Sequence, residues 1–178
     1  MVKDKSALRK EIRARLALLQ SLEKESRSVL IADAVKCHLA VSGARVVAIY
    51  SPLGDEPLLW PLVEDLSARM LVLLPKVEGD MMNFYPYDPR YMAMGAFGIM
   101  EPQSGEAVRP HEIDAVVVPG VAFTESGARM GRGKGFYDRY LSQKEFRGLK
   151  IGVCYSEQIV GELPVEPHDV KMDCVVHK

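Results

Sequence analysis

Five short apolar runs, separated by polar or amphipathic stretches, constrain the fold of this chain more than any other feature. They occupy residues 45–51, 70–75, 113–120, 149–156 and 173–177, and the first reads RVVAIYS. Apolar runs rich in β-branched residues, without alternation, are typical of strands covered on both faces. The sequence therefore predicts an α/β fold with a mainly parallel sheet and helices on both faces, in a Rossmann-like three-layer arrangement.

A pair of helices is expected before the sheet. Residues 4–20 carry leucines and an isoleucine at helical spacing, and Ser21 can begin a second helix that runs to about Ala40 and is broken by Gly43. Between the strands, a helix is expected over residues 58–68. Another helix is expected after the glycines near residue 135, and residues 76–113 are expected to form loops with short extended pieces.

Size and composition indicate one domain over residues 1–178 and no extended anionic partner. The formal net charge is -1, so the field of the whole chain offers no support for nucleic-acid or membrane binding. No apolar run approaches the roughly 20 residues of a membrane span, and the N-terminal region lacks a signal-peptide pattern. The three cysteines form no CxxC pair, which disfavours a zinc site. We expect a monomeric, cytoplasmic protein that acts on small molecules.

The stretch GRGKGFYD, residues 131–138, combines three glycines, two cations and a carboxylate directly before an expected helix. Glycines let backbone amides approach a ligand, and Arg132 and Lys134 can neutralise phosphate oxygens. Asp138 suits a Mg²⁺ ion that bridges phosphates. The spacing fits neither the P-loop nor the dinucleotide-binding pattern. The alternatives are an anion-binding loop, which we favour, and a solvated basic surface loop.

Residues 116–141 as a whole, VVVPGVAFTESGARMGRGKGFYDRYL, resemble the signature of the 5-formyltetrahydrofolate cyclo-ligase family. Four further motifs are similar to that family in the same order. They are KSALRKEIR (5–13), IYSPLGDEP (49–57), FGIMEP (97–102) and LPVEPHDVKMD (163–173). The resemblance therefore covers nearly the full chain, and five ordered motifs are more specific than one glycine loop.

The resemblance implies an enzyme that uses ATP and Mg²⁺ to cyclise 5-formyltetrahydrofolate to 5,10-methenyltetrahydrofolate, with release of ADP and phosphate. It implies catalytic roles for Lys134, Arg132 and Tyr137, and metal ligation by Asp138 and Asp173. The implied ATP contacts are Lys5, Ser6, Ala7, Leu8, Arg9, Arg129, Met130, Gly131, Arg132, Gly133, Lys134, Gly135, Phe136 and Tyr137. The implied folate contacts are Ser51, Glu56, Arg132, Gly133, Lys134, Gly135 and Phe136.

Several of these residues also have plainer interpretations. Lys5 and Arg9 can form a solvated helix face, Glu56 can be a charge at a helix N-terminus, and Asp173 can be an ordinary loop acid. His168 lies beside an aspartate, but without a nearby nucleophile we interpret it as structural or supporting. The tyrosines and methionines of residues 81–94 can line a folate pocket or belong to the core or an exposed loop.

Two other functions compete with the cyclo-ligase hypothesis. A nucleotide- or RNA-binding module could use the same loop, although the near-zero net charge and the lack of an aromatic stripe argue against extended RNA contact. A sugar-phosphate isomerase or transferase would rest on analogy with other α/β folds alone, and would act without ATP.

Overall fold

The computed structural model of the chain describes residues 4–95 and 98–178. Helix α1 (Lys5–Leu16) is followed by α2 (Ser21–Ser42), so the predicted N-terminal helical pair is present. The side chain of Asp4 caps α1 by accepting a hydrogen bond from the Ser6 N–H. Gly43 ends α2 with a φ of 70°, in the left-handed region that glycine adopts at little cost.

A six-stranded sheet forms the centre of the fold, in the order β10-β9-β6-β1-β2-β3. All neighbouring pairs are parallel except β2 and β3, which are antiparallel. The strands are β1 (Val46–Ala48), β2 (Leu71–Glu78), β3 (Met81–Pro86), β6 (Ala115–Pro119), β9 (Leu149–Cys154) and β10 (Cys174–His177). The five predicted strands are thus all present, and β3 adds an antiparallel edge to a mainly parallel sheet.

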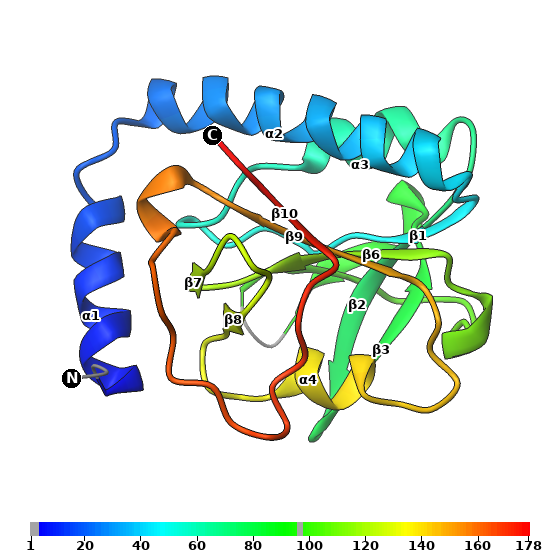
Figure 1. The fold of residues 1–178 in the computed structure, drawn as a ribbon. Coiled ribbons are helices and arrows are strands. Elements are labelled where there is room, and N and C mark those ends of the chain that lie inside the picture. Colours follow the sequence, from blue (N-terminus) through cyan, green and yellow to red (C-terminus); the bar gives the residue numbers. More distant parts are fainter. Residues whose placement is uncertain (1–3, 96–97) are drawn as a thin grey trace.

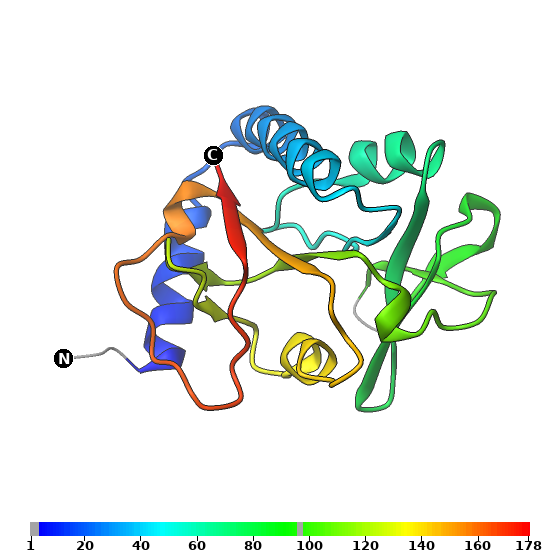
Figure 2. The same cartoon turned by 45° about the vertical axis from the view of Figure 1, so that its right-hand side comes forward.

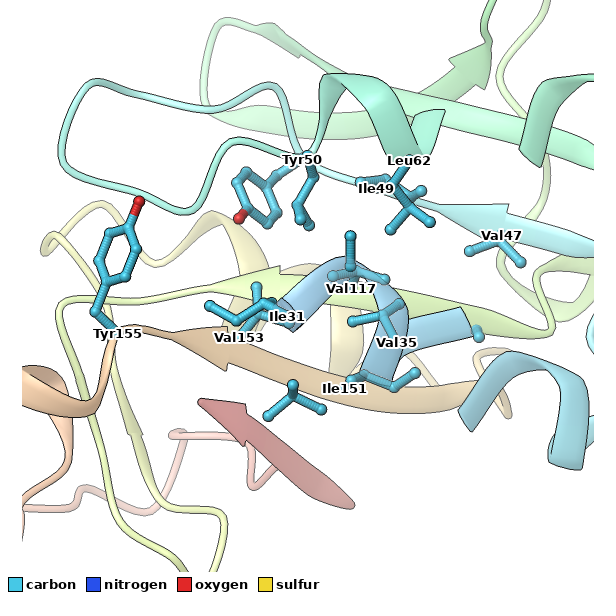
Figure 3. Packing of buried hydrophobic residues seen from close by; sticks show 14 of the residues in the cluster. Ile31, Val35, Val47, Ile49, Tyr50, Leu62, Val117, Ile151, Val153 and Tyr155 are labelled. Atoms are coloured by element: carbon cyan, nitrogen blue, oxygen red, sulfur yellow. The ribbon is translucent and has the colours of Figure 1, made fainter. Parts of the chain in front are cut away.

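Helices lie on both faces of the sheet, as predicted, but unequally. The long helix α2 and α3 (Trp60–Ser67) cover one face, whereas the short helix α4 (Phe136–Leu141) lies on the other (Figure 2). On the first face, Ile31 and Val35 of α2 belong to the same buried cluster as Val117 and Val153 of the central strands (Figure 3). Helix α1 stands at one end of the sheet, beside the loops that follow the strands (Figure 1).

The second buried cluster lies on the face covered by α4. Val116 and Val118 of β6 belong to it together with Phe84 of β3 and Tyr140 of α4. The Phe84 and Tyr140 rings meet edge to face with centroids 4.8 Å apart. Successive residues of β6 therefore enter opposite clusters, which explains why this strand is apolar throughout.

Short elements fill the regions between the main strands. They are β4 (Met92–Met94) paired with β5 (Met100–Pro102), β7 (Ala122–Phe123) paired with β8 (Arg129–Met130), and the 3₁₀ turns η1 (Pro89–Tyr91), η2 (Pro110–Glu112) and η3 (Ser156–Gln158). The predicted helix over 58–68 begins later, at Trp60, because Pro61 suits the first turn of a helix. Within the described ranges, no helix has the length and apolar character needed to cross a membrane.

Candidate active site

A cavity of about 410 Å³ opens beyond the carboxyl ends of β1 and β6. This is where ligands bind in mainly parallel sheets. Its walls come from six parts of the chain: the start of α1, residues 50–56, residues 75–82 of β2 and β3, residues 99–101, residues 119–138, and residues 166–169. Five of these parts lie within the five sequence motifs, so the fold brings all of the motifs to one place.

The glycine loop, residues 131–135, joins β8 to α4 and forms one wall of the cavity. Gly133 and Gly135 have φ values of 101° and 69°, so residues with side chains would be strained at both positions. Two arginines hold the loop through its backbone carbonyls. Arg9 Nε donates to the Gly131 carbonyl over 2.9 Å, and Arg139 Nη1 donates to the Lys134 carbonyl over 2.9 Å. Lys134 itself is exposed and lines the cavity.

Arg132 crosses from the glycine loop to the turn that follows β1. Its guanidinium donates to Glu56 Oε1 from Nε and Nη2, and it also bonds Asp55. The other oxygen of Glu56 accepts the Leu53 N–H over 2.9 Å. Burial raises the pKa of Glu56 above its ordinary value, and the Leu53 N–H and Arg132 only partly oppose this.

Arg129 is buried behind the loop and is held by two partners. Its Nη1 donates to the Pro119 carbonyl over 3.0 Å, and its Nη2 donates to Asp138 Oδ2 over 2.9 Å. Its guanidinium also lies 5.5 Å from the centroid of the Tyr137 ring. These contacts suit a residue that positions Asp138 and Tyr137. Burial raises the pKa of Tyr137, which therefore stays a neutral phenol.

An acidic group contacts the start of α1 at the wall of the cavity. Lys5 Nζ donates to Glu166 Oε2 over 2.6 Å and to Asp169 Oδ2 over 3.0 Å. Burial alone would raise the pKa of Asp169, but the Glu166 N–H and the Lys5 ammonium lower it below its ordinary value. One ligand atom from each of Glu166, His168 and Asp169 lies within 4.8 Å of the others. His168 is exposed and lies beside the Glu166 and Asp169 carboxylates.

Most of the predicted site residues lie around this cavity. The exceptions among the proposed ATP contacts are Ser6 and Ala7, which do not line it, and Leu8, whose side chain is buried in the core. Of the tyrosines and methionines in residues 81–94, Met82 lines the cavity. Ser51 also lines it and donates its hydroxyl hydrogen bond to the Met100 carbonyl.

The structure does not bring Asp173 to the cavity. Its carboxylate accepts the backbone N–H of Lys150 over 2.7 Å and pairs with the Lys150 ammonium at 2.9 Å, at the start of β9. Asp138 and Asp169 are the aspartates that line the cavity, and Asp138 Oδ1 accepts the N–H of Val170, the residue after Asp169. The sequence motif 163–173 contains both Asp169 and Asp173, and only their positions in the fold distinguish them.

Carboxylates at this wall fit a hard divalent cation. Asp138 and Asp169 offer oxygen ligands, and Glu166 lies beside Asp169. Mg²⁺ prefers such oxygens, commonly takes one or two carboxylates, and completes its shell with water and phosphate. Asp138 and Asp169 line the same cavity as the cationic glycine loop, an arrangement that suits a metal–polyphosphate ligand.

Comparison with known proteins gives one consistent result. The sequence profile of the 5-formyltetrahydrofolate cyclo-ligase family matches residues 1–178. The 5-formyltetrahydrofolate cyclo-ligase of Mycolicibacterium smegmatis is 35% identical over 184 residues, covering 94% of this chain and 93% of that protein. An NMR structure of Aquifex aeolicus 5,10-methenyltetrahydrofolate synthetase superposes with a TM-score of 0.87 at 39% identity, covering 97% of this chain and 89% of that one.

A second solved structure extends the comparison. The 5,10-methenyltetrahydrofolate synthetase of Mycoplasma pneumoniae superposes with a TM-score of 0.78 at 28% identity, and 98% of each chain is covered. Both structural relatives therefore span nearly the whole chain.

Proposed function

This chain belongs to the 5-formyltetrahydrofolate cyclo-ligase family, and we propose that it forms 5,10-methenyltetrahydrofolate from 5-formyltetrahydrofolate with ATP and Mg²⁺, releasing ADP and phosphate. The observation that carries the proposal is the convergence of three groups on one cavity. They are the cationic glycine loop, the buried carboxylate of Glu56 and the acidic group around Asp169. Together they supply sites for a polyphosphate, a polar ring system and a divalent cation.

The chemistry requires activation of a poor leaving group. The formyl oxygen attacks the γ-phosphorus of ATP, and the bond from that phosphorus to the ADP oxygen breaks. N10 of the folate then attacks the formyl carbon, loses its proton, and expels the former formyl oxygen as phosphate. Phosphoryl transfer depends mainly on positioning and on charge stabilisation. Lys134 and Arg132 supply positive charge, and Tyr137 supplies a neutral hydroxyl at the reacting groups.

We propose that ATP lies along the glycine loop, with Lys5 and Arg9 approaching it from α1. Both side chains line the cavity, and Arg9 already contacts the loop through the Gly131 carbonyl. Arg129 contributes indirectly, because its buried guanidinium is occupied by Pro119 and Asp138. We place Mg²⁺ on Asp138 and Asp169 in place of Asp173. When bound, the cation would neutralise phosphate charge during transfer.

The folate is proposed to occupy the opposite side of the cavity. Glu56 is buried and can accept hydrogen bonds from ring N–H groups, with Ser51 close by on the same turn. A buried carboxylate discriminates strongly, because a ligand that lacks the matching donors leaves the charge unpaired. We propose that the enzyme works on these small molecules as a cytoplasmic monomer.

The test is spectroscopic. Purified protein with 5-formyltetrahydrofolate, ATP and Mg²⁺ is expected to produce the absorbance of methenyltetrahydrofolate, and omission of ATP or chelation of Mg²⁺ is expected to stop it. Absence of product in the complete mixture would overturn the proposal. Turnover of a sugar phosphate without ATP would favour the isomerase, and salt-dependent RNA binding without turnover would favour the binding module.

A further inference from the structure

Glu101 is a buried carboxylate on the wall of the cavity to which the proposed reaction assigns no role. It lies on β5, in the motif FGIMEP, and only 4% of its surface is exposed. Its carboxyl group is held against the backbone of Gly95, where a Cβ atom would lie 2.2 Å from Glu101 Cδ. Any side chain at position 95 would therefore displace this carboxylate.

One half of the carboxylate is satisfied by the sheet and the other is not. Strand β1 pairs with residues Leu71–Leu73 of β2. After Leu73, the backbone groups that β2 directs toward the β1 side can therefore bond other residues. There the Val77 N–H donates to the Glu101 carboxyl group. Glu101 Oε1, in contrast, has no hydrogen-bond partner among the residues that the structure describes. A buried acceptor without a donor costs on the order of 1–3 kcal/mol, and more when it is charged.

The surroundings of Glu101 indicate which kind of ligand would supply the missing donor. The adjoining wall of the cavity contains Val77, Met82 and Ile99, so it is apolar and suits the face of a flat ring. A phosphate is unsuitable, because the Glu101 carboxylate would repel it. A ring that carries N–H donors satisfies both the apolar wall and the open acceptor.

We propose that Glu101 is a second recognition carboxylate for the pteridine ring, and that its Oε1 accepts a hydrogen bond from a ring N–H group. This inference rests on the proposed function, since it concerns how the same cavity selects its folate substrate. Glu56 and Glu101 would then accept hydrogen bonds from different N–H groups of one ring. Two separate acceptors fix the orientation of a ring better than one, which matters because the formyl group must meet the γ-phosphate.

The experiment compares Glu101→Gln and Glu101→Met with the unmodified protein. Glutamine keeps the shape and a neutral acceptor, whereas methionine removes the acceptor. We expect the Kd for 5-formyltetrahydrofolate to rise by roughly tenfold or more in Glu101→Met and by a smaller factor, roughly three- to fivefold, in Glu101→Gln. The Kd for a non-hydrolysable ATP analogue with Mg²⁺ should stay unchanged in both, and kcat at saturating folate should fall much less than kcat/KM.

Glu78→Gln is the matched control, because it removes a carboxylate on the neighbouring strand that lies outside the cavity. Thermal unfolding and binding of the ATP analogue report whether each variant is folded. If Glu101→Met does not fold, Glu101→Gln alone provides the test. Folate affinity within twofold of the unmodified protein in a folded Glu101 variant would overturn the inference. Failure of the unmodified protein to bind 5-formyltetrahydrofolate would instead overturn the proposed function.

Discussion

Arg132 and Glu56, from two walls of the cavity, are joined by two hydrogen bonds to a single oxygen. Arg132 Nε and Nη2 lie 3.2 and 3.0 Å from Glu56 Oε1. If Glu56 binds the pteridine, the folate must take over this oxygen, and Arg132 is then free to turn toward the phosphates. Binding of the two substrates should therefore be coupled, and coupling between two ligands is reciprocal.

Asp55 offers a way to test this coupling without altering a proposed substrate contact. It bonds Arg132 beside Glu56 but does not line the cavity. In Asp55→Asn, Arg132 is held less firmly, so the ATP analogue should bind more tightly in the absence of folate. We expect a gain of about 2- to 5-fold, which corresponds to the energy of one partly exposed ion pair. The gain in nucleotide affinity on adding folate should shrink.

Isothermal titration calorimetry with and without 5-formyltetrahydrofolate measures both quantities. Asp65→Asn is the control, since that carboxylate pairs with Lys36 and Arg69 on the surface near α3. Equal nucleotide affinities in Asp55→Asn and the unmodified protein, with and without folate, would refute the coupling.

Lys134 is expected to act through its charge on the transferred phosphoryl group. Lys134→Ala should lower kcat by about 100-fold or more while the fold is retained, because one positioned charge-stabilising group typically contributes that much. Lys144→Ala, at an exposed position after α4, is the control. Steady-state rates together with circular dichroism check the prediction, and near-normal turnover in Lys134→Ala would remove its catalytic role.

The metal assignment separates three aspartates. Asp138→Asn and Asp169→Asn should each raise the Mg²⁺ concentration needed for half-maximal activity, because each would remove one anionic ligand. Asp173→Asn should leave the titration unchanged, since its carboxylate is bound to Lys150 outside the cavity. If Asp173→Asn raises the required Mg²⁺ concentration and Asp169→Asn does not, the ligands would instead be Asp138 and Asp173, as the family resemblance implied.

The buried pair of Arg129 and Asp138 should matter for stability. In Arg129→Ala, the Asp138 carboxylate, which is only 13% exposed, loses its cationic partner. We therefore expect the free energy of unfolding to fall by about 3–5 kcal/mol. Arg90→Ala removes an arginine whose side chain is 78% exposed, and should cost about 1 kcal/mol or less. Urea unfolding measures both, and equal losses would contradict the structural role of Arg129.

Folate binding should weaken at acid pH. The pKa of Glu56 is raised above 4.5 by burial, so its proton returns at a higher pH than in an unfolded chain. Ring N–H donors need the ionised form, hence the Kd for 5-formyltetrahydrofolate should rise as pH falls through that raised value. For the same reason Glu56 favours the unfolded chain at neutral pH, and this unfavourable contribution diminishes on acidification.

Glu56→Gln provides the comparison for both effects. Its folate affinity should be lower at neutral pH and change less with acidification, when measured by fluorescence titration from neutral to weakly acidic pH. A pH dependence identical to that of the unmodified protein would show that Glu56 is not the titrating group.

The sequence predicts the centre of the sheet well because a central strand such as β6 is buried on both faces and therefore apolar throughout. It predicts the end of α2 for a similarly local reason, since Gly43 adopts a positive φ. The roles of Asp169 and Asp173 depend instead on the path of residues 163–173 across the molecule, which local composition does not encode. The contact of Arg132 with Glu56 joins residues 76 positions apart, and the role of Glu101 depends on a three-residue strand in a region expected to be loop.

The contact of Lys5 with Asp169 also bears on how the protein is made and handled. These residues are 164 positions apart, so the wall they share cannot form until all of residues 5–169 have left the ribosome. The amino end of α1 lies beside this wall, whereas the last strand ends near α2 at the other side of the molecule (Figure 1). An affinity tag fused after Lys178 should therefore leave this wall of the cavity undisturbed.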